Sequence, residues 1–230
     1  MLNFRDFEVL TFDCYGTLID WESGILGALR KAFAAHNRTF DDKEILEAYS
    51  VLEPLIQAER YRTYREVLTE VMHRLGTRYG IEWQGSEAES LADSIREWQP
   101  YPDTVDALRR LKSKYKLAII SNIDDDLFAH SARHLRVPFD YVITAQQVGS
   151  YKPLHWNFES ALATIGLPKD KVLHVAESLY HDILPASELG LHSVWVNRRA
   201  ARGGVGASKT ATTVPDLEVM DLKSLADIAV

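Results

Sequence analysis

The segment FDCYGTLID, residues 12–20, is the most informative part of this 230-residue chain. It continues the apolar run 9–12, which predicts a short buried strand. Asp13 then stands at the carboxyl end of that strand, the edge at which open parallel sheets bind ligands. A carboxylate there, followed by a tight Gly16-Thr17 turn, is placed to attack an electrophile. The alternative is that Asp13 only forms the turn.

Composition and charge restrict the class of protein. The chain is 46% hydrophobic and 26% charged, which is typical of a globular protein. A formal net charge of -7 disfavours a nucleic-acid partner, because phosphate binding needs a basic surface. No apolar stretch approaches the ~20 residues of a membrane span, and the first residues show no signal-peptide pattern. The single cysteine, Cys14, excludes an internal disulfide, so we expect a cytoplasmic protein.

Strands and helices alternate through the second half of the chain. Four further strand-like apolar runs lie at residues 116–120, 141–143, 171–175 and 193–196. Residues 104–115 and 158–165, between these runs, have apolar side chains at helical spacing. Alternation of this kind requires right-handed crossovers and a parallel sheet. We therefore predict a doubly wound α/β core built from residues 1–20 and 100–230.

The exception is the stretch of residues 21–99, which contains no convincing strand pattern. Its helical patterns lie near residues 23–36, 41–60, 63–79 and 86–98. We therefore predict that residues 21–99 form an all-helical domain inserted after the first strand. Residues 198–213, rich in Gly, Ala, Ser and Thr, are expected to form a surface loop.

Polar residues follow the other predicted strands. Ser121 and Asn122 come directly after the second strand, and Lys152 lies in the loop after the third. Glu177 and Asp182 lie in the segment after the fourth. Because the carboxyl ends of parallel strands meet at one edge of a sheet, we expect these groups to converge there.

In this order, the four polar segments resemble the four motifs of the haloacid dehalogenase-like hydrolases. The resemblance covers nearly the whole chain and implies that Asp13 is a covalent nucleophile. It implies that Lys152 keeps the Asp13 carboxylate ionised by opposite charge. Residues 21–99 would be the helical cap that covers the active site in this superfamily. The residues implied to orient the nucleophile and to bind a substrate anion are Thr17, Ser121 and Asn122.

Tyr15 distinguishes two branches of this superfamily. Its phosphatases place a second Asp two residues after the nucleophile, whereas this chain has Tyr15 there, as in the 2-haloacid dehalogenases. The resemblance then implies that Asp13 displaces a leaving group from C2 of a short carboxylic acid and forms an ester. Water, activated by Glu177 or Asp182, hydrolyses the ester to a 2-hydroxy acid. This reaction requires no metal or other cofactor.

Departures from the dehalogenase pattern leave alternatives open. Glu177 and Asp182 are five residues apart, which is similar to the phosphatase loop. With Asp13 they would hold Mg2+ in a small-molecule phosphatase of the same fold. A non-catalytic binding protein is the third alternative.

The segments around Asp13, Ser121 and Glu177 also resemble those of hydrolases that open azetidine-2-carboxylate. That reaction displaces a ring amine from C2, and an amine leaves best when it is protonated. The acids that could protonate it are Glu22, Glu177 and His181. Glu53 of the cap could bind an ammonium group.

The substrate contacts implied by the resemblance involve the cap and two aromatic positions. The residues expected to bind substrate are Tyr15, Trp21, Glu22, Arg60 and Phe158. Phe158 stands where the dehalogenases have a Tyr, and Arg62 and Arg65 are alternatives to Arg60 by chemistry. Packing for Tyr15 and a solvated helix face for the arginines are the non-functional interpretations. The expected partner is a small carboxylate, with a second copy of the chain as the other candidate.

Overall fold

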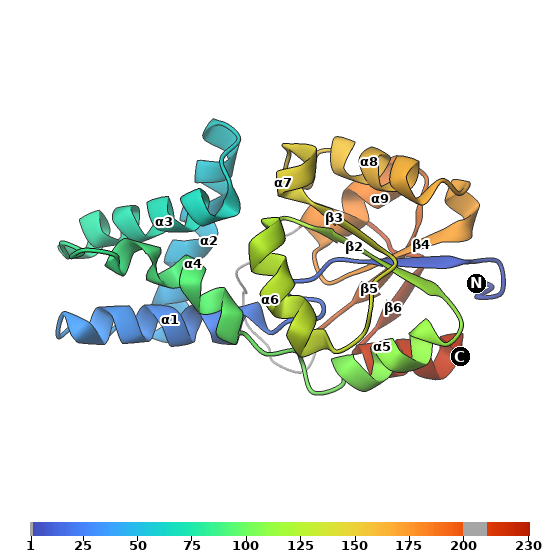
Figure 1. The fold of residues 1–230 in the computed structure, drawn as a ribbon, viewed down its shortest axis with the longest axis horizontal. Coiled ribbons are helices and arrows are strands. Elements are labelled where there is room, and N and C mark those ends of the chain that lie inside the picture. The colour runs from blue at the N-terminus through green and yellow to red at the C-terminus, as the bar shows by residue number, and fades with distance from the viewer. Residues whose placement is uncertain (1, 200–210) are drawn as a thin grey trace.

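The computed structural model describes residues 2–199 and 211–230. At its centre lies a parallel sheet with the strand order β3-β2-β1-β4-β5-β6 (Figure 1). The strands are β1 (Val9–Phe12), β2 (Lys116–Ser121), β3 (Tyr141–Thr144), β4 (Val172–Ala176), β5 (His192–Val196) and β6 (Leu217–Val219). All five predicted strands are present. β6 was not predicted, because only Val219 of its three residues is buried and its apolar pattern is therefore weak.

Helices cover both faces of the sheet (Figure 1). One face carries α7 (Ala145–Val148), α8 (Trp156–Ile165) and α9 (Leu184–Glu188), and the other carries α5 (Thr104–Lys112), α6 (Asp125–Leu135) and α10 (Leu222–Ala229). Within β1, Val9 packs in the cluster with α8, whereas Leu10 and Phe12 pack in the cluster with α5 and α10. The short segments η3 (Lys169–Lys171) and η4 (Leu179–Ile183) flank β4. The predicted doubly wound α/β core is confirmed. Most of the predicted loop at residues 198–213 lies outside the described residues.

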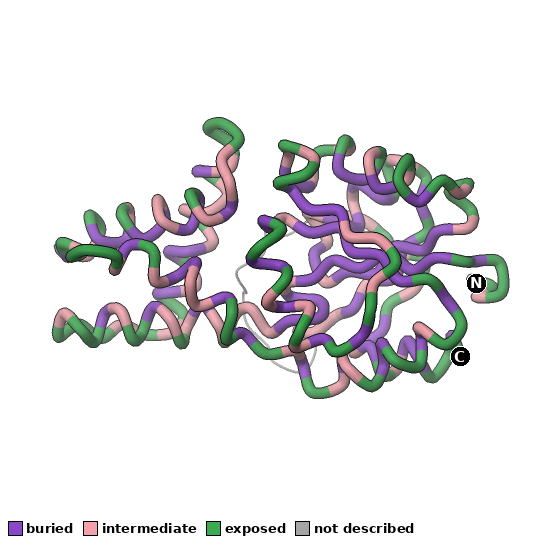
Figure 2. Tube along the Cα trace, viewed as in Figure 1, coloured by how far each residue is buried: buried purple, intermediate pink, exposed green. Residues whose placement is uncertain are grey.

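The stretch of residues 21–99 is helical throughout its regular structure and lies beside the sheet (Figure 1). Its elements are α1 (Trp21–Ala35), α2 (Asp42–Glu59), α3 (Tyr64–Tyr79), η1 (Glu87–Glu89), α4 (Ser90–Ser94) and η2 (Ile95–Glu97). Each of the three long helices buries one side against its neighbours (Figure 2). The last predicted helix is broken into three short pieces, and the Ser94 hydroxyl donates to the Leu91 carbonyl there. Serine side chains that bond to nearby backbone weaken a continuous helix.

A carboxylate of the α/β core caps a helix of this stretch. Asp124, in the turn before α6, accepts hydrogen bonds of 2.9 Å from the backbone N–H groups of Tyr64 and Arg65. These N–H groups belong to the first turn of α3, where a negative charge is favoured by the helix dipole. Tyr151 of the core also donates to the Arg62 carbonyl at 2.8 Å. These bonds hold the start of α3 above the carboxyl ends of the strands.

The strand order places a crevice beside β1. The chain continues from β1 to β2 on one side, and β4 follows on the other side. In open α/β sheets ligands bind where the strand order reverses in this way. Asp13 directly follows β1, and Glu177 and Asp182 follow β4, so both segments lie at this crevice.

Gly24 of α1 allows the Trp98 ring to pack against the helix. A Cβ atom at position 24 would lie 2.5 Å from the ring, whereas a Cβ atom at Gly27 of the same helix would meet nothing within 4 Å. We expect Gly24→Ala to lower the free energy of unfolding by about 1–3 kcal/mol through overpacking. Gly27→Ala is the matched control and should raise it by up to about 1 kcal/mol, because alanine favours helix. Urea unfolding of both variants tests this, and equal effects would contradict the close packing of Trp98.

Candidate active site

A small cavity of about 60 Å³ lies at the carboxyl edge of the sheet, between the core and residues 21–99. Eight of its lining residues come from core loops: Asp13, Tyr15, Ser121, Asn122, Lys152, Ser178, His181 and Asp182. Four come from the helical stretch: Trp21, Glu53, Pro54 and Tyr64. We call this cavity the reaction pocket. It brings together groups from the loops after β1, β2, β3 and β4, as the sequence predicted for the edge of a parallel sheet.

Asp13 is buried at the floor of the reaction pocket, and both of its oxygens have donors. Its Oδ1 accepts from the Lys152 ammonium at 2.9 Å, and its Oδ2 accepts from the Thr17 hydroxyl at 2.7 Å. The Thr17 hydroxyl in turn accepts from the backbone N–H of Glu177 at 2.9 Å. The carboxylate is therefore fixed in orientation by its own turn and by the β4 loop.

Lys152 is a buried cation shared by two carboxylates. Its ammonium donates to Asp13 at 2.9 Å, to Asp182 at 2.6 Å and to the Ile120 carbonyl at 2.9 Å. Burial lowers the pKa of Lys152, but the two carboxylates outweigh it and raise that pKa above its usual value. Asn122 fixes the Lys152 backbone, since its amide N donates to the Lys152 carbonyl at 3.0 Å and its oxygen accepts from the Lys152 N–H at 2.7 Å.

Burial and neighbouring charges both act on the pKa values of the two carboxyl groups that share the Lys152 ammonium. Burial raises the pKa of Asp13 more than Lys152 and Thr17 lower it, so the net shift is upward. Burial also acts on Asp182, but Lys152 and the imidazole of His174 outweigh it and lower the pKa of Asp182. Asp13 directly follows β1 and is held by both Lys152 and Thr17, which favours it as the nucleophile.

Two residues that line the reaction pocket each carry a buried polar atom with no hydrogen-bond partner within the described part of the chain. They are the Ser121 hydroxyl and the Asp182 Oδ2 atom. Buried polar atoms are normally hydrogen-bonded, so an unpartnered pair on residues that line one cavity indicates places for a bound molecule. A hydroxyl suits a substrate anion, and a carboxylate oxygen suits a water that must lose a proton.

The Tyr15 side chain is not placed to act as an acid or a base. Its hydroxyl lies 2.8 Å from the Ser131 hydroxyl, and its ring packs edge-on against Trp98 at a centroid distance of 5.9 Å. Burial raises the pKa of Tyr15 well above its usual value, so the hydroxyl stays protonated at neutral pH. Tyr15 therefore contributes a wall of the reaction pocket rather than a second acid.

Glu177 acts on the site through its backbone, and its side chain does not line the reaction pocket. Its carboxylate lies 3.2 Å from Arg199, which also pairs with Glu22 at 2.5 Å. The set Asp13, Glu177 and Asp182 that a magnesium ion would need is therefore not assembled. In residues 2–199 and 211–230 no group of three His, Cys, Asp or Glu side chains is arranged for a metal ion.

Glu177 makes stability depend on pH near neutrality. Its burial, only partly opposed by Arg199, raises the pKa of Glu177 to about 7 from 4.5. The folded state therefore loses stability as pH rises from about 4.5 to 7, where the unfolded chain ionises first. Between pH 5 and pH 8 we expect this loss to be about 3 kcal/mol and to disappear in Glu177→Gln. Urea unfolding of both proteins at the two pH values measures it, and parallel pH profiles would contradict it.

Only some of the predicted substrate-binding residues line the reaction pocket. Trp21 and Tyr15 line the reaction pocket, whereas Glu22 is paired with Arg199 and does not. Arg60 is exposed at the end of α2 and does not line the pocket either. The alternatives to it are engaged elsewhere: Arg62 pairs with Glu59, and Arg65 pairs with Asp93 and Asp126.

Phe158 is placed differently from the prediction. It is fully buried on α8, in the cluster beneath the sheet, and packs edge-on against His174 at 5.1 Å. The ring lies on the inner face of α8, so it contacts the sheet and not the reaction pocket. The structure therefore gives Phe158 a packing role.

Several pocket residues were not predicted from the sequence. Tyr64 closes the pocket from α3, and its hydroxyl lies 2.9 Å from that of Tyr49. Ser178 lines it from the β4 loop, with its hydroxyl 3.1 Å from the Nδ1 atom of His181, a pocket residue that the sequence analysis did name as a candidate acid. The β4 loop motif already contained Ser178 and His181, but no periodic pattern distinguishes Tyr64 from the other aromatic residues of the cap.

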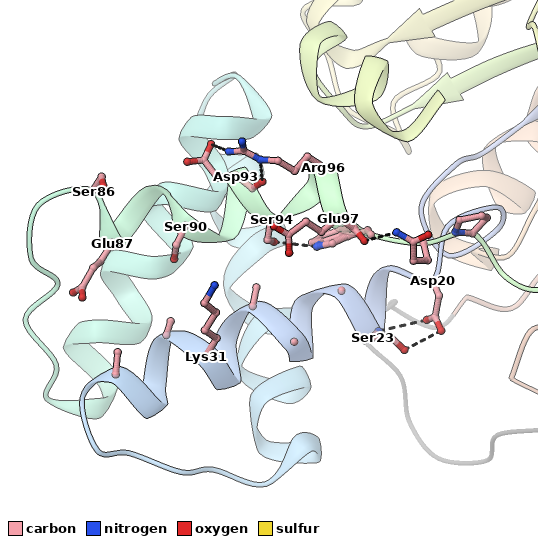
Figure 3. Close-up of a pocket in the computed structure, with 18 of the residues that line it drawn as sticks. Asp20, Ser23, Lys31, Ser86, Glu87, Ser90, Asp93, Ser94, Arg96 and Glu97 are labelled. Carbon is pink, nitrogen blue, oxygen red and sulfur yellow. Dashed lines mark hydrogen bonds and ion pairs between the residues drawn. The ribbon is translucent and has the colours of Figure 1, made fainter. Parts of the chain in front are cut away.

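A second, larger cavity of about 820 Å³ lies between α1 and the α4 segment (Figure 3). Figure 3 shows Lys31 pointing from α1 into this space and Ser90 lying on the opposite side. The Trp98 ring that forms part of its wall also packs against Tyr15 of the reaction pocket. This larger cavity contains none of the buried carboxylate–lysine cluster, so the reaction pocket is the candidate active site.

Across the two described ranges, no helix combines the length and the apolar character that crossing a bilayer requires.

Comparison with known proteins agrees with this geometry. A family model described as haloacid dehalogenase-like hydrolase matches residues 7–190. The (S)-2-haloacid dehalogenase H-109 of Pseudomonas putida is 30% identical over 96% of this chain and 96% of that protein. The glyceraldehyde 3-phosphate phosphatase of Methanothermobacter thermautotrophicus is 28% identical over 75% of this chain and 84% of that protein. The crystal structure of L-2-haloacid dehalogenase from Xanthobacter autotrophicus with chloropropionic acid covalently bound has a TM-score of 0.79 at 22% identity, covering 96% and 98% of the two chains. This chain is an enzyme that belongs to the haloacid dehalogenase-like hydrolase family.

Proposed function

We propose that the enzyme displaces a leaving group from C2 of a short carboxylic acid, through an ester on Asp13, and releases a 2-hydroxy acid. The observation that carries this proposal is the surroundings of Asp13. Its carboxylate is oriented by Lys152 and Thr17, while Tyr15 occupies the position where a phosphatase needs its second acid. Displacement at carbon by a halide leaving group needs no such acid.

In the first step, an Asp13 oxygen attacks C2 from the side opposite the leaving group. The C2–leaving group bond breaks as the C2–O bond forms, so the configuration at C2 inverts. The unpartnered Ser121 hydroxyl supports a site for the substrate carboxylate. Holding the carboxylate there would orient C2 toward Asp13 and lower the entropic part of the barrier.

In the second step, water attacks the carbonyl carbon of the Asp13 ester. The unpartnered Asp182 Oδ2 takes a proton from this water and returns it to the alkoxide as the ester C–O bond breaks, which gives the 2-hydroxy acid. The second proton of the water stays on the Asp13 carboxyl group and is then lost to solvent. Since the ester is cleaved at its carbonyl and not at C2, the inverted configuration is retained in the product. Asp13 returns to a carboxylate beside Lys152.

The reaction pocket also supports an amine leaving group. No arginine lines it within the described residues, while Glu53 of α2 does. A carboxylate there favours a substrate that carries an ammonium group beside C2, such as azetidine-2-carboxylate. His181, which also lines the pocket, could donate a proton to the departing ring nitrogen.

We further propose that residues 21–99 act as the cap of this enzyme. Four residues of this stretch line the reaction pocket together with the core loops, which supports a role in substrate contact. A cytoplasmic location and assembly with a second copy of the chain stay predictions from the sequence.

The test is product analysis by mass spectrometry with EDTA present. The panel contains both enantiomers of 2-chloropropionate, fluoroacetate and azetidine-2-carboxylate, and a matched reaction contains Mg2+ and p-nitrophenyl phosphate. A 2-hydroxy acid formed in EDTA, with inverted C2, is the expected result. In H2(18)O, a single turnover should label the Asp13 carboxylate and leave the product hydroxyl unlabelled. Phosphate release that requires Mg2+, without any 2-hydroxy acid, would favour the phosphatase instead.

A further inference from the structure

A buried imidazole lies directly beneath the reaction pocket and takes no part in the steps above. His174 is on β4 and is fully buried. Its Nε2 atom lies 2.9 Å from Asp182 Oδ1, and its Nδ1 atom lies 2.9 Å from the Thr11 hydroxyl. Thr11 and His174 are register partners on the neighbouring strands β1 and β4, so their side chains leave the sheet on the same face.

The hydrogen bonds fix which atoms carry protons. Asp182 is ionised, because Lys152 and His174 lower its pKa despite its burial, so its Oδ1 can only accept. His174 Nε2 must therefore carry a hydrogen and donate it. In the neutral ring, Nδ1 then accepts from the Thr11 hydroxyl, which completes a chain of donors from β1 to Asp182.

Both donors to Asp182 meet the same oxygen. Lys152 and His174 approach Oδ1 at 2.6 and 2.9 Å, while Oδ2 is buried with no hydrogen-bond partner in the described structure, and Asp182 is one of the residues that line the reaction pocket. A lysine ammonium at the end of a flexible chain can follow a rotating carboxylate, whereas an imidazole on a central strand cannot. His174 is thus the rigid support that fixes the orientation of the Asp182 carboxylate.

We propose that His174, held by Thr11, is a positioning residue that keeps Asp182 Oδ2 directed at the water that hydrolyses the Asp13 ester. The inference rests on the proposed function and assigns the pair to its second step. In that step the water O–H bond breaks, its proton moves to Asp182 Oδ2, and the water oxygen bonds to the ester carbonyl carbon. The first step, attack of Asp13 on C2, involves neither Thr11 nor His174.

The assignment predicts that the two steps separate when His174 is replaced. His174→Phe should slow ester hydrolysis by about 10- to 100-fold, the effect of losing a hydrogen bond to a charged group that must be aligned. The first turnover of leaving-group release should stay within about twofold, because a well-aligned nucleophile sets its rate. The Asp13 ester should then accumulate at steady state.

The experiment uses stopped-flow chloride release and intact-protein mass spectrometry with (S)-2-chloropropionate. His174→Gln, whose amide can still donate to Asp182, should recover much of the hydrolysis rate, and Thr11→Val should have a smaller effect of the same kind. His155→Phe, at an exposed histidine paired with Glu188, is the control for the same replacement and should behave like the wild type.

Each outcome decides the inference. Ester accumulation in His174→Phe with a normal first turnover supports it, and equal slowing of both steps without accumulation overturns it. If His174→Phe does not fold, unchanged ester hydrolysis in both Thr11→Val and His174→Gln overturns it as well. If the wild type itself releases no leaving group, the proposed function is refuted, and this role with it. The variants cannot give that result, because their outcomes are measured against an active wild type.

Discussion

Asp13→Asn is expected to lower kcat by at least about 10⁴-fold, since an amide oxygen is a far weaker nucleophile than a carboxylate. The substituted side chain has nearly the same shape, and its amide oxygen can still accept from Lys152. The loss should therefore appear in kcat while the fold is kept. Chloride or ring-opened product, measured against the wild type under single-turnover conditions, gives the ratio.

Although its kcat falls, Asp13→Asn should not lose free energy of unfolding. Wild type places two buried carboxylates, Asp13 and Asp182, around one ammonium. Asp13→Asn removes the excess negative charge, so the free energy of unfolding should equal or exceed that of the wild type. Glu8→Gln, the same replacement at an exposed acid next to the opposite end of β1, controls for the chemistry of the change. An Asp13→Asn protein that is folded and retains more than about 1% of the activity would exclude Asp13 as the nucleophile.

The core and the centre of the site were predictable because they depend on strand ends. An apolar run followed by Asp13 identifies both a buried strand and the edge where it stops. The same holds for Ser121 at the end of β2 and for the acidic segment after β4. Since all these strands are parallel, their ends converge without any knowledge of side-chain packing.

The groups that depend on tertiary contacts could not be predicted in the same way. His174 lies within a strand whose other residues are apolar, so the pattern only says that it is buried. Its partner Asp182 is fixed by how η4 turns back over β4. Phe158 was assigned by its distance along the chain from Lys152, but the orientation of α8 turns it toward the sheet. Asp124 reaches a helix about sixty residues earlier in the chain, a contact that no local pattern encodes.

Cap residues were the least predictable for a related reason. A helix presents several polar side chains, and which of them faces the pocket depends on how the helix crosses the core. Glu53 and Tyr64 line the reaction pocket, whereas Arg60, which lies between them in the sequence, is exposed. Charge alone identified both Glu53 and Arg60 as candidates, and only the structure separates the one that lines the pocket from the one that does not.

Lys152→Met is expected to cause the largest loss of stability. It leaves Asp13 and Asp182 buried without their shared ammonium, and breaking a buried ion pair from one side costs about 3–5 kcal/mol. For a chain of this length the unfolding temperature should fall by roughly 6–20 °C. Lys43→Met is the control, because Lys43 pairs with Glu47 at 3.8 Å on the exposed surface, where such a pair contributes at most about 0.5 kcal/mol. Calorimetry of both variants at pH 8 measures the difference.

The pH dependence distinguishes lost charge pairing from lost packing. Without Lys152, burial raises the pKa values of both carboxyl groups above those of the unfolded chain. A raised carboxyl pKa destabilises the folded state above the unfolded pKa and ceases to do so below it. The stability gap between Lys152→Met and the wild type should therefore narrow as pH falls from 8 to 4. Adding Asp182→Asn should recover part of the stability at pH 8 but none of the activity, since the ammonium and the base are then both absent. A gap that is constant across this range would show that Lys152 stabilises the fold by filling space, and that Asp13 and Asp182 do not depend on its charge.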